Sequence, residues 1–380
     1  MTPSQPPAAH LLHLARPLSA LMLGLATLCA CERAPQPPAA PPEAARAATA
    51  SFLMSTHHAC ALADDGQLWC AGANDAGQLG DNTTQTRGEL RPVEGLNHVV
   101  GVALSPLHAT CAWEEEGALW CWGGNESSLL GPGVEQDHSP LPLKIQGLPP
   151  VTQVTLGAYH ACALTTDAQV YCWGENRRGQ LGRGQPSLPD PTPTAVPGLT
   201  DVRALSAGLE HTCALTNRGA IHCWGHNRHH ALGLGPQSPN LVSAPTELPL
   251  SEPAHALAAA GYHTCAATGA QRALVCWGDN SFGQLGLGDR LTRAEPSPVP
   301  GAFGLAELAT SGAITCFRDI EARVYCAGGS PDAPVEPTAS FQLAAGLSST
   351  RAIGAAMGGV CGIHGDHEIV CRKLDLATEE

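Results

Sequence analysis

Aromatic and charged side chains are scarce in this 380-residue chain, at 4% and 14% of the residues, and no long stretch shows helical periodicity. Glycine and proline are abundant instead, with 42 and 32 residues. This composition disfavours a helical bundle or an α/β sheet and favours short strands joined by many turns. The formal net charge of -14, with no basic stripe to offset it, argues against nucleic acid as a partner.

The sequence motifs of common enzymes are absent as well. The chain contains no GxSxG, P-loop, HExxH or Rossmann sequence. Its Asp and Glu residues are scattered, and no pair stands out as a catalytic acid and base. We therefore predict a non-enzymatic protein with no catalytic, metal-binding or cofactor-binding residues, and no cofactor.

Cysteine supplies the dominant pattern. Fourteen of the 16 cysteines form seven pairs, separated by ten residues within a pair or, once, eleven, and the pairs recur every 51 or 52 residues with a last step of 45. A fixed period near fifty indicates one small unit copied along the chain, each copy burying its apolar face against the next. The sequence thus predicts an all-β, seven-bladed β-propeller over residues 49–380. The pairs are Cys60 and Cys70, Cys111 and Cys121, Cys162 and Cys172, Cys213 and Cys223, Cys265 and Cys276, Cys316 and Cys326, and Cys361 and Cys371.

Each pair is predicted to form a disulfide within its own blade. Cys60 and Cys70 flank ALADDGQLW, which suits a hairpin with the three-residue loop 64–66, and EEG and NRG recur at the same place. Opposed residues of antiparallel strands lie about 4.5 to 5.5 Å apart at Cα, within reach of a disulfide. Zinc is the alternative, but structural zinc sites use close spacings such as CxxC, which these pairs do not have.

The first 31 residues differ from the repeats. A weakly basic start leads into the apolar run 18–28 and then LCAC, a layout typical of a secretory signal and too short for a membrane span. LCAC resembles the bacterial lipobox, which implies that Cys31 is lipidated and becomes the mature N-terminus. Residues 32–48, rich in Pro and Ala, are expected to form a semi-rigid tether. A cleaved export signal with a disordered tail is the alternative, and either version places the domain where disulfides persist.

Short motifs recur around the cysteines. AYHACAL, LEHTCAL and GYHTCAA contain the first cysteine, CWGGN, CWGEN, CWGHN and CWGDN begin with the second, and NDAGQLG, NRRGQLG and NSFGQLG follow. This combination resembles the RCC1 repeat, named for the regulator of chromosome condensation, whose units close as a seven-bladed β-propeller. The last two repeats depart from it, since AGGS follows Cys326 and RKLD follows Cys371. Kelch propellers share the period, but their Gly-Gly motif does not recur here.

The resemblance implies several functions. The eukaryotic namesake exchanges guanine nucleotide on a nuclear GTPase through an inserted wedge and binds chromatin, but the exported location, the acidic balance and the lack of a clear inserted segment disfavour both here. Bacterial members that look similar are secreted, and one kind inhibits β-lactamases by covering the active site with a propeller face. We therefore place this chain in a bacterial secreted or lipoprotein branch of the family.

Tryptophan and histidine also recur at fixed places. The tryptophans directly after the second cysteine point to the opposite side of the strand and are expected to fill the gap between blades. The histidines two residues before the first cysteine are expected to donate to a backbone carbonyl of an adjacent strand, because packed sheets lie about 10 Å apart and equivalent imidazoles cannot share one zinc ion. These residues are Trp122, Trp173, Trp224 and Trp277, and His58, His160, His211 and His263.

A separate local histidine cluster lies at His226, His229 and His230. It could bind a metal adventitiously, with a solvated loop as the alternative interpretation.

Repeat symmetry predicts two different loop faces. All hairpin turns share one register and should emerge on one face of the disc, while the NxxGQLG loops emerge on the other. The hairpin face is expected to be acidic through Asp64, Asp65, Glu114, Glu115, Glu116, Asp167, Asp319, Glu321, Asp366 and Glu368. Arginines next to an aromatic residue expected to be exposed form a candidate partner-binding patch on the other face, since such residues dominate hot spots. The patch comprises Arg177, Arg178, Arg228, His229 and Phe282. The alternative is that these charges merely keep the disc soluble.

Together these features predict an exported, lipid-anchored protein-recognition scaffold in a bacterial cell envelope, at the outer membrane or cell surface. We expect a monomer that touches the membrane only through its N-terminal lipid and binds an envelope or secreted protein. The alternatives are an inhibitor of a secreted enzyme such as a β-lactamase, a guanine-nucleotide exchange factor, and an envelope hydrolase or lyase with a site in the central channel.

Overall fold

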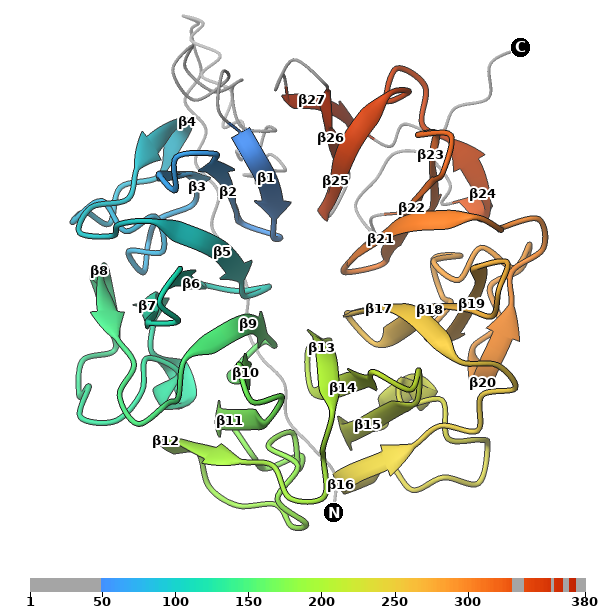
Figure 1. The fold of residues 1–380 in the computed structure, drawn as a ribbon, viewed down its shortest axis with the longest axis horizontal. Helices are drawn as coiled ribbons and strands as arrows, with labels where there is room; N and C mark the ends of the chain where they lie inside the picture. Colours follow the sequence, from blue (N-terminus) through green and yellow to red (C-terminus); the bar gives the residue numbers. More distant parts are fainter. Residues whose placement is uncertain (1–48, 330–337, 357–358, 365–368, 374–380) are drawn as a thin grey trace, which may run out of the picture. The chain divides into compact units, whose positions relative to one another are not determined.

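The computed structural model describes residues 49–329, 338–356, 359–364 and 369–373. The predicted signal peptide, Cys31 and the tether 32–48 lie outside these residues. Within them, seven antiparallel sheets follow one another along the chain and form a ring (Figure 1). The structure confirms the predicted seven-bladed β-propeller.

Each blade is a meander whose strands pair in chain order, from the inner strand outward. Blade 1 contains β1 (Thr49–Met54), β2 (His58–Ala63), β3 (Leu68–Gly72) and β4 (Arg87–Pro92). Blade 2 contains β5 (Val99–Leu104), β6 (Ala109–Glu114), β7 (Leu119–Gly124) and β8 (His138–Lys144). Blade 3 contains β9 (Val151–Leu156), β10 (His160–Thr165), β11 (Val170–Gly174) and β12 (Asp190–Ala195). Blade 4 contains β13 (Val202–Ala207), β14 (His211–Thr216), β15 (Ile221–His226) and β16 (Leu241–Glu247).

The remaining blades continue the same order. Blade 5 contains β17 (Ala254–Ala260), β18 (His263–Thr268), β19 (Ala273–Gly278) and β20 (Arg293–Pro298). Blade 6 contains β21 (Leu305–Ser311), β22 (Ile314–Asp319), β23 (Val324–Gly328) and β24 (Thr338–Leu343). Blade 7 contains β25 (Thr350–Ala356), β26 (Gly359–His364) and β27 (Ile369–Lys373). Two short 3-10 helices, η1 (Glu126–Ser128) and η2 (Arg228–His230), lie in the loops of blades 2 and 4.

A disulfide joins the second and third strands of every blade, as predicted. The Cα atoms of the paired cysteines are 4.0 to 4.2 Å apart, slightly closer than the expected 4.5 to 5.5 Å. Such short separations are typical of antiparallel positions whose backbones do not hydrogen-bond to each other. In every blade the two cysteines lie directly opposite each other: Cys60 and Cys70, Cys111 and Cys121, Cys162 and Cys172, Cys213 and Cys223, Cys265 and Cys276, Cys316 and Cys326, and Cys361 and Cys371.

The predicted hairpin turns account for this register. Gly66, Gly117 and Gly219 all have φ near +80°, the left-handed conformation that the third residue of such a turn requires. Ala168 and Ala322 adopt φ of 60° and 61° at the same place. The turn geometry is therefore kept even where glycine is missing.

The apolar core lies between neighbouring blades. Trp122 of blade 2, fully buried, packs against Cys60, Leu68 and Leu79 of blade 1, and the other three tryptophans occupy equivalent places. This confirms that they fill the gap between blades. Blades 7 and 1 close the ring, since β1 contacts β25 and β26 and Phe52 shares a cluster with Ile363.

Candidate interaction surface

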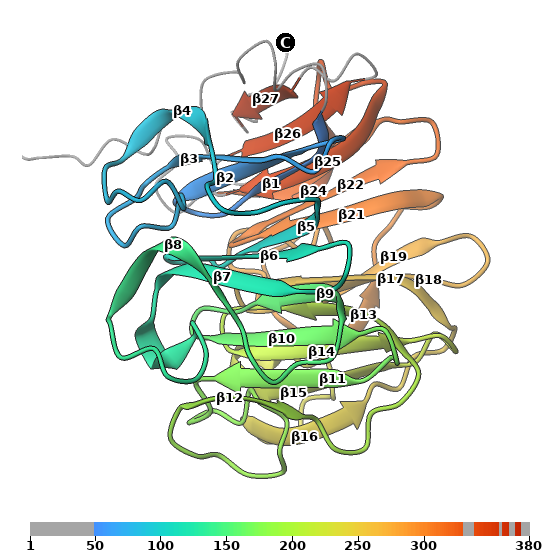
Figure 2. The same ribbon diagram turned by 60° about the vertical axis from the view of Figure 1, so that its left-hand side comes forward.

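The loops gather at the two ends of the strands, which Figure 2 shows from the side. We call one end the hairpin face; it carries the turns between the second and third strands of each blade and the connectors from one blade to the next. There the amide of Val99, which begins blade 2, donates to the Gly66 carbonyl of blade 1 at 3.1 Å. We call the other end, with the inner turns and the loops that follow the third strands, the loop face; Ala73 donates to the His57 carbonyl there (2.9 Å). The predicted separation of the two loop sets holds for the described turns, while residues 365–368 lie outside them.

Buried asparagines shape the loop face. Asn176 is 1% exposed; its Oδ1 accepts from the Leu181 amide at 3.1 Å and its Nδ2 donates to the Gln185 carbonyl at 3.1 Å. Equivalent bonds to the residue five positions on are made by Asn74, Asn125, Asn227 and Asn280. In blades 1 to 5, the asparagine four residues after the second cysteine therefore holds the loop in place, so that the variable residues after it are presented in a fixed conformation.

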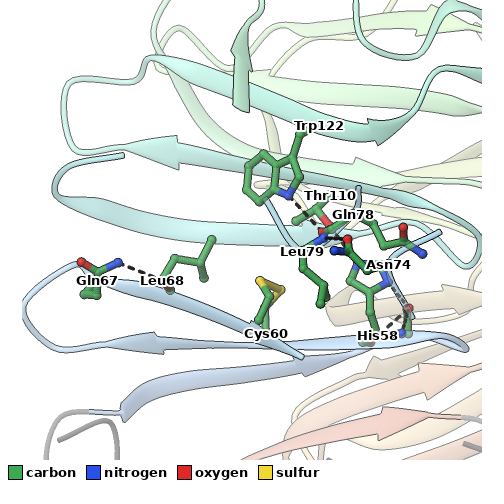
Figure 3. The surroundings of a disulfide bond; sticks show 11 residues. His58, Cys60, Gln67, Leu68, Asn74, Gln78, Leu79, Thr110 and Trp122 are labelled. Atoms are coloured by element: carbon green, nitrogen blue, oxygen red, sulfur yellow. Dashed lines mark hydrogen bonds between the residues drawn. A yellow bond between two sulfur atoms is a disulfide. The ribbon is translucent and has the colours of Figure 1, made fainter. Parts of the chain in front are cut away.

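A hydrogen-bond network links neighbouring blades beneath these loops (Figure 3). His58 Nε2 lies 2.8 Å from Thr110 Oγ1 in the next blade, and that hydroxyl donates to the Gln78 carbonyl at 2.9 Å. Because the hydroxyl proton is committed to the carbonyl, His58 must donate from Nε2. Trp122 Nε1 donates to the same carbonyl at 3.0 Å.

The expected histidine partner was therefore wrong. The imidazoles bind a threonine hydroxyl of the next blade and not a backbone carbonyl, because the inner turns direct the rings across the gap between blades. Burial lowers the pKa of His58 and His211 to about 3, with neighbouring histidines adding to the effect, and that of His160 and His263 to about 4. All four are neutral structural residues at neutral pH.

The structure brings together only part of the predicted patch. Arg228 lies over the Tyr262 ring, with 5.3 Å from its guanidinium carbon to the ring centroid, and the His229 ring lies 5.5 Å from the same ring. Arg177 and Arg178 are exposed in the neighbouring blade, with Arg177 bound to Glu175 at 2.9 Å. Tyr262 is the residue that sequence reasoning missed, and its place in an inner turn next to the variable loop is the only signal.

Phe282 does not meet the expectation of an exposed aromatic. Its side chain is partly buried, and its amide donates to Gln284 Oε1 at 2.9 Å. The aromatic component of the loop face comes from the inner turns instead: Tyr159 of blade 3 is 40% exposed and Tyr262 of blade 5 is partly exposed.

The loop of blade 4 is also strained. His229 and His230 adopt φ of 54° and 60°, and His230 replaces a glycine such as Gly179 of blade 3. Left-handed conformations cost about 1–2 kcal/mol for residues other than glycine and persist mostly at functional sites. The loop of blade 2 shares this geometry at Ser127 and Ser128.

The hairpin face is less acidic than predicted. Asp319 is only 4% exposed and binds Arg323 at 2.7 Å, because the turn folds its carboxylate back onto the following strand. Arg218 and Arg272 are exposed on the same face. Among the predicted acidic residues that the structure describes, the exposed ones are Asp64, Asp65, Glu115, Glu116, Asp167 and Glu321, and Glu114 is partly buried. Asp366 and Glu368 lie outside the described residues.

An apolar pair on the hairpin face escaped the sequence analysis. Phe303 and Ile320 are 53% and 75% exposed, and the Ile320 amide donates to the Gly304 carbonyl at 3.0 Å. Other blades carry residues such as Asn97 and Asp64 at these repeat positions. This departure from the repeat was the available signal.

The candidate histidine cluster forms no metal site in the described part of the chain. No group of three or more His, Cys, Asp or Glu residues is placed there to hold a metal ion. In the same part, no helix has the length and apolar character needed to cross a bilayer. His226, from the candidate histidine cluster, binds Glu210 at 2.7 Å instead.

Fold and site define a repeat β-propeller whose fixed loops present variable side chains. The family model of the RCC1-like domain matches residues 21–348. The chain belongs to the RCC1-like domain family, as its motifs indicated.

Relatives and solved structures agree with this assignment. The chain is 32% identical to the ultraviolet-B receptor UVR8 of Arabidopsis thaliana over 239 residues, which cover 61% of the chain and 53% of the receptor. It is also 32% identical over 254 residues to the mitochondrial RCC1 domain-containing protein RUG3 of the same plant, covering 64% of the chain and 56% of that protein. The chain thus spans about half the length of these relatives.

The solved structure of Prp20p from Saccharomyces cerevisiae, described with its binding to Gsp1p and histones, superimposes with a TM-score of 0.72 at 20% identity. The match covers 86% of this chain and 82% of that one. Human WBSCR16 gives a TM-score of 0.71 at 19% identity over 81% and 89% of the two chains. At such identities the likeness establishes the fold.

Proposed function

We propose that this protein is an exported scaffold that binds another protein through the loop face of blades 3 to 5. The observation that carries the proposal is the stacking of Arg228 and His229 on Tyr262 in a strained loop. Arginine and tyrosine are enriched in binding hot spots, and a preformed loop loses little entropy on binding. Arg178, exposed in the next blade, adds a second cation to the same face.

The described part of the chain begins on the hairpin face, opposite to the face that carries Arg228. Thr49 pairs with Ala63, beside the first hairpin turn, so the chain enters the ring at the hairpin face. Seven disulfides support a location outside the reducing cytosol.

Replacing Arg178, Arg228 and Tyr262 by alanine is expected to abolish partner capture. Truncation of a hot-spot residue costs about 2 kcal/mol or more, so affinity should fall at least about 30-fold. The measurement is crosslinking of the full-length protein in its native cell, with identification of the envelope proteins captured. A matched variant, Arg218→Ala with Arg272→Ala on the hairpin face, should capture the same proteins as the wild type. Equal capture by the loop-face variant would contradict the proposal.

Lipidation makes a separate prediction. Cys31→Ala should move the protein from the membrane fraction to the soluble fraction, because a stable anchor is lost with the acyl chains. The control is Cys29→Ala, which keeps Cys31 and should remain in the membrane fraction. Membrane association that survives Cys31→Ala, measured by fractionation and by the mass of the mature N-terminus, would exclude the anchor.

A further inference from the structure

The outer edge of blade 7 differs from that of the other blades. In blades 1 to 6 the third strand pairs with a fourth, and a residue of the fourth strand lies opposite the second cysteine, as Arg91 lies opposite Cys70. Among the described residues, β27 pairs only with β26. The equivalents of Arg91 are Leu143, Thr194, Thr246, Ser297 and Gln342.

Burial of the disulfides reflects this difference. Cys371 is partly exposed. The second cysteine of each other blade is fully buried, at 0% exposure: Cys70, Cys121, Cys172, Cys223, Cys276 and Cys326. A fourth strand normally covers the third on this side. The partial exposure of Cys371 therefore agrees with an edge that no other described strand covers.

The repeat shows which segment of this chain would fill the edge. In all six four-stranded blades, the residue opposite the second cysteine stands eight positions before the first residue of the next inner strand, as Arg91 does before Val99. In all seven blades, the first residue of the inner strand pairs with the residue three positions after the first cysteine of that blade. In blade 1 this pair is Thr49 and Ala63. The same count back from Thr49 gives Pro41.

Residues 37–43 do not suit that place. In every four-stranded blade, one residue of the fourth strand lies opposite the second cysteine, and the amide two residues after it donates to a carbonyl of the third strand. In blade 1 the Val93 amide donates to the Leu68 carbonyl at 2.9 Å. Because every second amide of an antiparallel strand donates to the same neighbour, the residue opposite the second cysteine must donate to the third strand as well. Pro41 would stand at this position, and proline has no N–H to donate. Glu43 would take the place of Val93, whose equivalents are buried and apolar: Ile145, Val196, Leu248, Val299 and Ala344.

We propose that the edge of β27 binds an extended segment of another protein as the fourth strand of blade 7. Backbone hydrogen bonds would supply affinity, as in other cases of strand addition to a sheet edge. The repeat defines the ligand: a residue other than proline opposite Cys371, and an aliphatic residue two positions later. Arg372 is exposed on the edge strand, which favours an acidic residue across from it.

A peptide copied from blade 6 tests the proposal. The probe is TASFQLAAGL, residues 338–347, labelled with a fluorophore and titrated into the oxidised full chain. We expect saturable micromolar binding and slowed amide exchange in β27. A Gln342→Pro peptide should bind at least tenfold more weakly, and a Phe341→Glu peptide, with the acidic residue across from Arg372, more tightly at low salt. Strand addition would be refuted if the unmodified peptide failed to bind or if the proline peptide bound equally well. The acidic preference would be refuted if the glutamate peptide bound equally or more weakly.

Repair of the chain's own segment provides the complementary test. Pro41→Thr with Glu43→Val restores the pattern of blade 3, so the edge should close in cis, protect the β27 amides and prevent peptide binding. Pro38→Thr is the control, because blade 3 has Pro191 at that position, and it should leave binding unchanged. Protection of β27 in the unmodified chain would show that its own segment fills the edge, and a dimer by size exclusion would assign the edge to a second copy; either result would overturn the proposal.

The edge is distinct from the loop-face patch. The variant lacking Arg178, Arg228 and Tyr262 is therefore expected to bind the peptide normally.

Discussion

Lowering the pH from about 7.5 to about 5 is expected to reduce the free energy of unfolding by about 8 kcal/mol, which is a large part of the stability of a typical domain. The cause is the set of four buried histidines that link neighbouring blades. Their pKa values are about 3 or 4 in the folded state against 6.5 as the reference. As the pH falls from 6.5 toward the folded-state pKa values, these histidines therefore bind protons in the unfolded chain but not in the folded chain.

The sign and size follow from this difference. A depressed folded-state pKa of a histidine means that stability is fully present above 6.5 and falls with pH down to the folded value. At pH 5 each histidine contributes a loss of about 2 kcal/mol, since one pH unit corresponds to about 1.36 kcal/mol. Carboxylates with a lowered pKa, such as those of Asp81 and Asp190, lose their contribution only as the pH falls below the ordinary aspartate pKa of 3.8.

Denaturant titrations at several pH values measure the effect. His211→Gln keeps a donor for Thr264 and should reduce the slope against pH by about a quarter, in proportion to the four linked sites. His138→Gln is the control, because His138 is exposed. A stability that stays constant between pH 7.5 and 5 would mean that these imidazoles are not neutral donors in the folded protein.

Reduction of the disulfides is expected to unfold the ring. Each closes a loop of about eleven residues, worth about 2.8 kcal/mol in the chain-entropy model, so seven contribute about 20 kcal/mol, more than the 5–15 kcal/mol typical of a folded protein. Six pairs are fully buried, whereas Cys371 is partly exposed. We therefore expect the bond between Cys361 and Cys371 to be reduced first and the others only as the ring opens.

Timed alkylation with mass spectrometry follows the order of reduction, and circular dichroism follows the fold. The matched comparison is Cys361→Ser with Cys371→Ser against Cys162→Ser with Cys172→Ser. Each should lose a similar loop-closure contribution, but only the first should remove the fast phase of reduction. A fully reduced protein that keeps its ring would show that packing between blades suffices by itself.

Much of the fold was evident from the spacing of a few residues. Cysteines ten residues apart around a turn with glycine determined the hairpin, its register and the disulfide, because all of these depend on contacts within one blade. The tryptophan after the second cysteine also indicated its own place, since alternate residues of a strand point to opposite sides.

The candidate site was predicted less well. Arg228 and His229 were found as variable loop residues, but Phe282 proved partly buried, and Tyr262 was missed. Exposure of a loop side chain depends on how the loop folds back, and proximity to Tyr262 depends on the packing of two blades. Neither is encoded in the period of a single repeat.

The sequence by itself determined the number of blades, the pairing of the cysteines and the family, because each follows from local geometry repeated seven times. Only the tertiary structure decided which hydroxyl each histidine binds, which charges remain exposed on each face, and that β27 has no fourth strand among the described residues. The physical reason is that these features arise between blades, where residues about fifty positions apart meet, and a repeat pattern specifies each blade but not the particular side chains across the gap.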